Sequence, residues 1–244
     1  MSQSSDFFQI AIDGPVAAGK GTTSRILAEK LNFLYVDTGA MYRVAALLAL
    51  RHHLTFTDET AIVKLLENSQ LEMRNPQGDK EADGRLTTLI LDGEDVSWTI
   101  RTEKCSDGAS KVSTMPKVRQ VLVEKQKQIA EKQNVVMEGR DITFKVLPKA
   151  DLKIFLTADL TTRAQRRHLQ YLNKGIDKSL DEVIKEVETR DHRDMTRKID
   201  PLHQTADSWL LDSSHLTIDQ VVDLISERVA VMMQDKSKHA SSKN

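Results

Sequence analysis

A glycine-rich loop near the amino terminus constrains this chain more than any other feature. The loop is Gly14-Pro15-Val16-Ala17-Ala18-Gly19-Lys20-Gly21-Thr22, with an apolar run before it at residues 7–12 and an amphipathic one after it at 19–31. This order predicts a strand, a loop and a helix, the context in which a G-x-x-x-x-G-K match binds phosphate. Backbone N–H groups and the helix N-terminus would attract phosphate oxygens, and Lys20 would neutralise the outer phosphates.

The residue after the lysine departs from the usual loop. A hydroxyl that faces a metal ion commonly stands there, but this chain has Gly21, and the hydroxyl moves to Thr22. A shuffled chain of this composition would contain about 0.03 matches to the pattern, so chance does not explain the loop.

Length and composition are typical of a soluble globular protein. A chain of 244 residues can bury one core and carry a modest insertion. Its 35 basic residues are matched by 36 acidic ones, which argues against a nucleic-acid partner. The single cysteine, Cys105, suits a reducing cytosol, and the seven histidines show no zinc-ligand spacing. No run approaches 18 apolar residues, so we expect a cytoplasmic protein without a membrane partner.

Apolar periodicity predicts an α/β fold. Five short apolar runs predict buried strands, at residues 7–12, 33–36, 134–137, 152–156 and 208–211. Amphipathic patterns predict helices at 19–31, 40–53, 116–133, 160–172, 180–190 and 218–233. This alternation predicts a five-stranded parallel sheet flanked by helices, with ligands at the carboxyl ends of the strands.

Two regions interrupt this pattern. Residues 71–106 contain a turn at 74–79 and a strand, tight turn and strand over 85–96, which predicts a small antiparallel insert between core segments 1–70 and 107–235. Residues 190–197 alternate charges with few apolar anchors, as in a mobile lid, which we place at about 160–200. We expect the polar tail at 236–244 to be frayed.

Charged groups follow two of the predicted strands. Asp37-Thr38-Gly39-Ala40-Met41-Tyr42-Arg43 would cap a helix, or place Arg43 on a second phosphate at the sheet edge. Glu138-Gly139-Arg140-Asp141 would form a buried Arg–Asp ion pair, or give Arg140 to phosphate and Asp141 to a donor group of the substrate.

Taken in order, these segments resemble the bacterial-type cytidylate kinases over nearly the whole chain. The matching pieces are the glycine loop, the segment 37–43, Asp92-Gly93-Glu94-Asp95-Val96-Ser97 with Ile100-Arg101, Ala109-Ser110, Pro116-x-Val118-Arg119, Gly139-Arg140-Asp141, Lys153-Ile154-Phe155-Leu156, Arg190-Asp191-x-Arg193-Asp194-x-x-Arg197 and Leu211-Asp212-Ser213-Ser214. The resemblance implies a five-stranded P-loop kinase core, a lid and an inserted domain over the nucleoside monophosphate.

The resemblance also implies a role for each residue. The loop 14–22 would hold ATP, with Mg²⁺ as cofactor and Thr22 facing it, and Lys20, Arg140 and Arg197 would be catalytic. CMP or dCMP would be bound by Thr38, Tyr42, Arg43, Ser110, Arg119, Arg140, Asp141, Arg190, Asp194 and Arg197. Of these, Ser110, Arg119 and Asp141 would read the cytosine edge, and Arg190 and Asp194 would approach the ribose. The family favours a monomer.

Two positions depart from the family pattern. Thr38 stands where the family often has serine, which keeps the hydroxyl. Thr143 stands where the family usually has glycine, and would strain the turn beside Asp141 if that glycine needs a positive φ.

Two other functions would use the same glycine loop. One is phosphoryl transfer to UMP or to a small metabolite, and the other is nucleotide sensing without catalysis.

Overall fold

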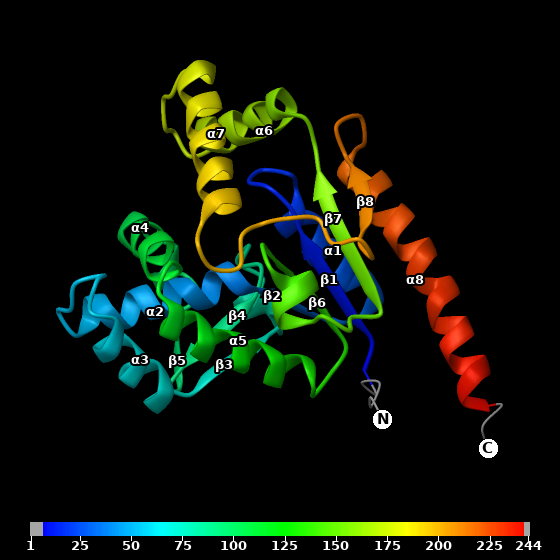
Figure 1. Ribbon diagram of the computed structural model, residues 1–244, viewed down its shortest axis with the longest axis horizontal. Coiled ribbons are helices and arrows are strands. Elements are labelled where there is room, and N and C mark those ends of the chain that lie inside the picture. Colours follow the sequence, from blue (N-terminus) through cyan, green and yellow to red (C-terminus); the bar gives the residue numbers. More distant parts are fainter. Residues whose placement is uncertain (1–6, 242–244) are drawn as a thin grey trace.

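The core of the protein is a five-stranded parallel sheet. The computed structural model describes residues 7–241, and its strand order is β2-β6-β1-β7-β8 (Figure 1). The strands are β1 (Gln9–Asp13), β2 (Leu34–Asp37), β6 (Val135–Gly139), β7 (Leu152–Thr157) and β8 (Trp209–Asp212). Every pair is parallel, with Ala11 aligned to Met137 on one side and to Lys153 on the other. The predicted fold class is confirmed.

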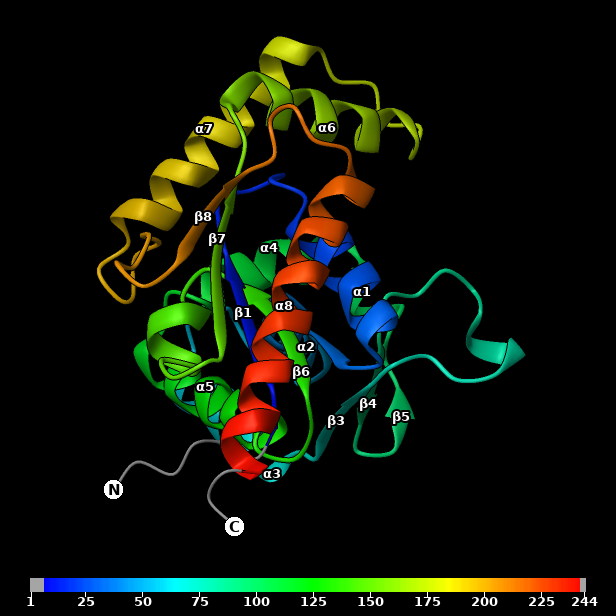
Figure 2. The same cartoon turned by 90° about the vertical axis from the view of Figure 1, so that its right-hand side faces the viewer.

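Helices cover both faces of this sheet because its central strand is apolar on both sides. Ile10 and Ile12 pack with Leu27 of α1 (Lys20–Leu31) and Ile225 of α8 (Ile218–Ser241). Figure 2 shows these two helices side by side over that face. On the other face, Ala11 joins the core formed with α2 (Thr38–Arg51), α3 (Glu59–Asn68), α4 (Glu103–Val112) and α5 (Pro116–Ala130). The central strand therefore buries both of its faces, as is usual in parallel sheets, whereas the edge strand β8 leaves Leu210 exposed.

A second, antiparallel sheet lies beside α2 and α3. It consists of β3 (Leu71–Arg74), β4 (Thr88–Leu91) and β5 (Glu94–Asp95). Asp92 and Gly93 connect β4 to β5 and both have positive φ, 52° and 85°, the conformation that a tight Asp-Gly hairpin turn requires. Figure 2 shows the connection between β3 and β4 projecting from the body of the molecule. The end expected for the insert, at residue 106, falls inside α4, a helix that the sequence analysis did not identify.

Helices α6 (Leu160–Leu172) and α7 (Leu180–Thr196) form the upper part of the molecule in Figure 1. The helix predicted at 180–190 continues for six more residues, so the segment expected to be a mobile lid is helical as far as Thr196. Its buried residues recur every four positions as Val183, Val187 and Asp191. The third anchor is a buried carboxylate, and a search for apolar anchors alone missed it.

The last helix also differs from the prediction. Helix α8 continues to Ser241, eight residues beyond the predicted end and through most of the tail expected to be frayed, while residues 242–244 lie outside the described chain. Within residues 7–241, no helix combines the length and the hydrophobicity needed to span a membrane.

Candidate active site

The glycine loop connects β1 to α1 at the carboxyl edge of the sheet. Gly14 has a φ of 154°, and a Cβ there would lie 2.0 Å from the carbonyl oxygen of Leu156, so only glycine fits. Gly19 precedes the helix with a φ of 91°. The loop is therefore shaped by backbone conformation and by the close approach of β7.

Lys20 is the first residue of α1 and is only 5% exposed. Its Nζ donates to the carbonyl oxygen of Pro15 at 2.8 Å and has no carboxylate within ion-pair distance among the described residues. Burial, together with the nearby charge of Arg140, lowers the pKa of Lys20 to about 7, although Glu138 opposes the shift. A buried cation without a paired anion is suited to receive phosphate.

Gly21 leaves space at the position where a hydroxyl commonly faces the metal. A Cβ there would lie 3.4 Å from both Glu138 Oε1 and Tyr35 Oη, and burial raises the pKa of Glu138. Thr22 is exposed on the first turn of the helix. Within residues 7–241, no three His, Cys, Asp or Glu side chains are grouped to hold a metal. This sparse donor set fits Mg²⁺ that is coordinated mainly by water and nucleotide phosphates.

The first turns of α2 place Thr38, Tyr42 and Arg43 at the carboxyl end of β2. Asp37 caps the helix by accepting from the backbone N–H of Ala40 at 3.1 Å, so the capping interpretation holds for that residue. The hydroxyl of Thr38 donates to the carbonyl oxygen of Glu138 at 2.7 Å, which joins the ends of β2 and β6. Arg43 donates to Ser106 Oγ, and burial lowers its pKa.

Arg140, at the end of β6, is paired with a carboxylate of α7. Its Nε lies 2.6 Å from Asp194 Oδ2. The sequence analysis considered an Arg140–Asp141 pair, and the structure shows an ion pair with a different partner. Arg190 is exposed and forms no ion pair with any residue from 7 to 241, although it lies on the same helix.

Asp141 instead lies between two other arginines. It forms an ion pair with Arg119 of α5, and its second oxygen lies 3.5 Å from Arg197 at the end of α7. The guanidinium of Arg119 lies over the ring of Tyr42, 5.9 Å from its centroid. The pKa of Tyr42 rises to about 12 because its hydroxyl is buried. Two of the three residues predicted to read the base, Arg119 and Asp141, therefore meet beside Tyr42. The third, Ser110, accepts from Arg193 of α7 at 2.8 Å.

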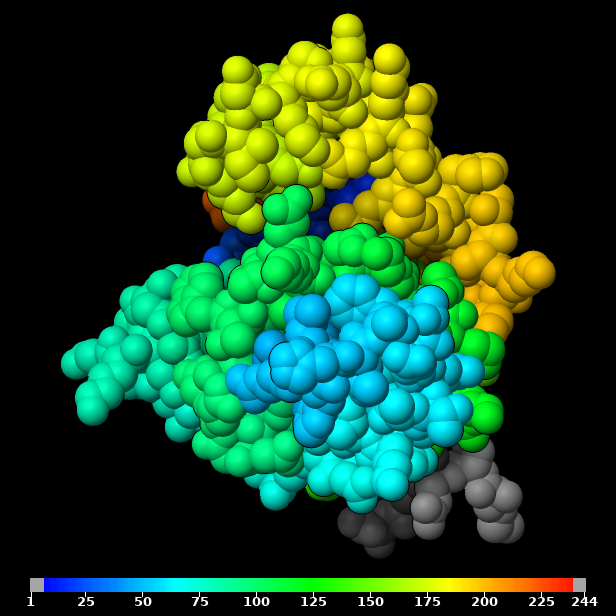
Figure 3. Space-filling model, turned by 90° about the vertical axis from the view of Figure 1, so that its left-hand side faces the viewer, coloured from blue at the N-terminus to red at the C-terminus, as the bar shows by residue number. Residues whose placement is uncertain are grey.

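Figure 3 shows a hollow between the upper helices and the lower body, with atoms coloured blue, from early in the described chain, visible at its floor. Polar contacts that the sequence analysis did not assign join the upper helices to the glycine loop. Asp191 of α7 accepts from the backbone N–H of Val16 at 3.1 Å and pairs with Arg163 of α6 at 2.5 Å. Arg163 also donates to the carbonyl oxygen of Val16 at 3.1 Å. The upper helices are thus attached to the tip of the glycine loop.

A further missed residue, Asp13, holds the loop that carries Asp141. This carboxylate accepts from the backbone N–H groups of Ile142 and Thr143 at 3.0 and 2.8 Å, and from the Thr143 hydroxyl at 2.7 Å. Thr143 is not among the described residues with positive φ, and it lies in the π-helical segment Ile142–Val146. The strain considered for Thr143 is therefore absent, and its hydroxyl strengthens the turn.

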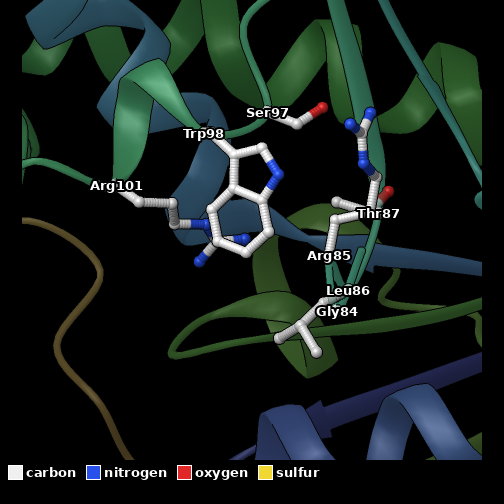
Figure 4. A pocket seen from close by; sticks show the side chains of 7 residues that line it. All are labelled: Gly84, Arg85, Leu86, Thr87, Ser97, Trp98 and Arg101. Carbon is white, nitrogen blue, oxygen red and sulfur yellow. The ribbon is translucent and has the colours of Figure 1, made fainter. Parts of the chain in front are cut away.

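A pocket of about 170 Å³ lies in the insert, and no residue of the glycine loop lines it (Figure 4). Its lining residues are Gly84, Arg85, Leu86, Thr87, Ser97, Trp98 and Arg101. Arg101 also lies 3.4 Å from Asp37 at the end of β2. The pocket contains none of the predicted site residues.

Strand order and the position of the glycine loop together define a class of protein. The loop leaves the central strand of the sheet β2-β6-β1-β7-β8, and a helix begins at the loop lysine. A parallel sheet with a phosphate loop at the carboxyl end of its central strand is the P-loop kinase fold.

Comparison with known proteins narrows this class. The family model described as Cytidylate kinase matches residues 10–231, so the chain belongs to the cytidylate kinase family. Cytidylate kinase from Lactobacillus gasseri is 42% identical over 95% of this chain and 96% of its own length. The enzyme of that name from Carboxydothermus hydrogenoformans is 45% identical over 90% and 96%. The resemblance in the sequence motifs is confirmed.

Comparison with solved structures does not narrow the class of protein further. Shikimate kinase from Bacteroides thetaiotaomicron aligns with 91% of this chain and 98% of its own, at 13% identity and a TM-score of 0.45. A likeness of that size carries no conclusion about this chain.

Proposed function

We propose that this protein transfers the terminal phosphoryl group of ATP to CMP or dCMP, giving ADP and CDP or dCDP. The observation that carries the proposal is the meeting of Tyr42, Arg119 and Asp141 at the carboxyl ends of β2 and β6. Family membership and cytidylate kinase relatives that align over most of the chain support it.

Cytosine and uracil present different hydrogen-bonding groups to this cluster. Cytosine offers an amino donor at N4 and acceptors on its ring, whereas uracil has an oxygen in place of the amino group. Asp141 and Ser110 would accept from the amino group, and Arg119 would donate to the ring acceptors. Opposite uracil, the Asp141 carboxylate would face an oxygen in a buried site, which disfavours UMP.

The acceptor phosphate would lie among Thr38, Arg43, Arg140 and Arg197, at the carboxyl ends of β2 and β6. A phosphate with a second pKa of about 6 is already anionic near neutral pH, so the reaction needs no general base. The chain therefore contributes alignment and charge neutralisation, through Lys20 on the donor side and arginines on the acceptor side. Arg190 and Asp194 would contact the ribose.

Mg²⁺ bound with ATP would neutralise charge on the transferred phosphate, with Thr22 and Glu138 as the side chains facing it. Helices α6 and α7 would act as a lid that excludes water, since water would otherwise hydrolyse ATP. Their attachment to the tip of the glycine loop through Asp191 and Arg163 supports this role. We propose that the enzyme acts as a monomer.

Turnover with CMP, dCMP, UMP and AMP under ATP and Mg²⁺ tests the proposal. We expect CMP and dCMP to be the preferred acceptors. Preferred turnover of UMP or of a small metabolite would instead indicate another phosphotransferase, and ATP binding without turnover would indicate a nucleotide sensor.

A further inference from the structure

Asp200 is a largely buried carboxylate in the loop between α7 and β8, and neither motif nor spacing assigns it a role. Its Oδ2 accepts from Arg119 Nη2 at 3.1 Å and from Arg119 Nε at 3.3 Å. Its Oδ1 lies 3.5 Å from Lys145 Nζ, and its backbone oxygen accepts from Arg197 Nε at 2.7 Å. One residue thus contacts three cations around the base site.

In this cluster two carboxylates balance the two arginines, and the half-exposed Lys145 adds a third cation at the edge. Arg119 and Arg197 face Asp141 and Asp200, and the side chain of Arg119 is only 3% exposed. A buried guanidinium needs a compensating anion, because an uncompensated buried charge is strongly destabilising. Asp200 is therefore the second anion that allows Arg119 to remain charged when Asp141 acts on a ligand.

The hydrogen bonds of Arg119 show which of its donors remain for a ligand. A guanidinium has five N–H groups. Nε donates to Asp200, Nη2 donates to Asp200 and Asp141, and Nη1 donates to the carbonyl oxygen of Ser113 at 3.2 Å. One N–H of Nη1 has no acceptor among the residues that the structure describes, and it is available to a base.

We propose that Asp200 is a positioning residue for base selection, an inference that rests on the proposed function. By binding Nε and Nη2, Asp200 fixes the plane of Arg119, so that Nη1 is directed to the ring acceptors of cytosine. It also prevents Arg119 from forming a two-point pair with Asp141, which would occupy both oxygens of the carboxylate that must accept from the amino group. Asp200 itself does not touch the nucleotide.

The backbone at Asp200 makes a clean test possible. Its φ is 46°, in the left-handed region, where asparagine is tolerated as well as aspartate. Asp200→Asn therefore removes the charge and keeps the backbone conformation. Asp207→Asn is the matched control, because Asp207 lies in the same loop but pairs with Lys153 at 2.6 Å and has a 64% exposed side chain.

The experiment measures kcat/KM for CMP and for UMP, and KM for ATP, in the wild type and both variants. In Asp200→Asn, we expect the CMP/UMP ratio to fall by about fivefold, mainly through a higher KM for CMP, which is the size of one ordinary hydrogen bond. KM for ATP should not change, and Asp207→Asn should behave as the wild type. Lys145→Gln, which removes the outer cation, should lower the ratio by about twofold.

Three outcomes would overturn the inference. An unchanged ratio would show that Asp200 does not act on base selection, and a parallel loss for CMP and UMP would show a structural role only. If Asp200→Asn does not fold, Lys145→Gln provides the test, and an unchanged ratio in that variant overturns the inference equally. If the wild type phosphorylates CMP but the variant has the same CMP/UMP ratio as the wild type, only this inference is refuted. If the wild type does not phosphorylate CMP, the proposed function is refuted as well.

Discussion

The donor and acceptor sides of the candidate site are stabilised in different ways. On the donor side, nine consecutive residues form a loop shaped by backbone geometry, and the buried Lys20 has no carboxylate partner among the described residues. On the acceptor side, Arg119, Arg140 and Arg197 come from separate segments, and each is already paired with a carboxylate. A phosphate would therefore satisfy an unpaired charge on one side and compete with existing ion pairs on the other.

This difference has a consequence for specificity. A loop that offers backbone N–H groups and one unpaired cation recognises phosphate and not the base, so it attracts any polyphosphate. A site whose arginines are already paired with carboxylates favours a ligand that matches both the arginines and the carboxylates. We therefore expect discrimination between nucleotides on the acceptor side, and the two sides should respond differently to substitution.

The largest effect is expected on the donor side. Lys20→Ala removes the unpaired cation, and kcat should fall by about 10²-fold or more, as for the loss of one preorganised electrostatic group. Steady-state turnover on folded protein measures this. Lys30→Ala is the control, since Lys30 lies on the same helix but forms an exposed pair with Asp223. Near-normal turnover of Lys20→Ala would show that this loop is not the donor site.

A smaller effect, confined to the acceptor, is expected from the arginines. Arg140→Ala and Arg43→Ala should each weaken CMP binding or turnover by about 2 kcal/mol, roughly 30-fold, as expected for a buried charge-assisted contact. ATP binding measured alone by calorimetry should barely change. Arg25→Ala, which removes a partly exposed arginine of α1, should leave CMP turnover and ATP binding unchanged. Equal damage to ATP binding would assign these arginines to the donor side.

A selective effect is expected from Asp141. Asp141→Asn gives the site an amide that can donate to uracil, so the ratio of kcat/KM for CMP over UMP should fall by about tenfold, mostly through lost CMP activity. Arg119 keeps Asp200 as its partner in this variant, which should preserve folding. If Asp141 only holds the two arginines, both substrates should lose activity in parallel and the ratio should stay constant.

The smallest effect concerns stability and pH. The pKa of Lys20 is lowered to about 7 in the ligand-free protein, so the unfolded chain binds more protons than the native one between pH 7 and the normal lysine pKa of 10.5. The contribution of Lys20 to the free energy of unfolding therefore rises with pH, by about 1 kcal/mol between pH 7 and pH 8. Denaturant unfolding of the wild type and Lys20→Met should show this slope in the wild type only. A variant with the same slope would mean that Lys20 does not titrate there.

Local patterns in the sequence were enough to predict the strand, loop and helix of the proposed donor side. The glycine loop, the strand before it and the helix after it are contiguous, so a phosphate site could be inferred from a single stretch of sequence. The five core strands were also predicted, because each is a short apolar run within two residues of its position in the structure. Helix α3 was missed because only Ile62 and Leu66 are fully buried in it, which is too weak a pattern to recognise.

The partners on the acceptor side were decided by the tertiary structure. The sequence supplied the arginines and Asp141 as candidates, but Arg140 pairs with Asp194, 54 positions away, and Arg119 with Asp200, 81 positions away. Such pairs depend on where the end of α7 and the loop after it cross the sheet edge, and no local pattern encodes that crossing. The sequence determined which charges the site contains, and the three-dimensional packing decided which of them neutralise one another, because electrostatic pairing depends on distance in space.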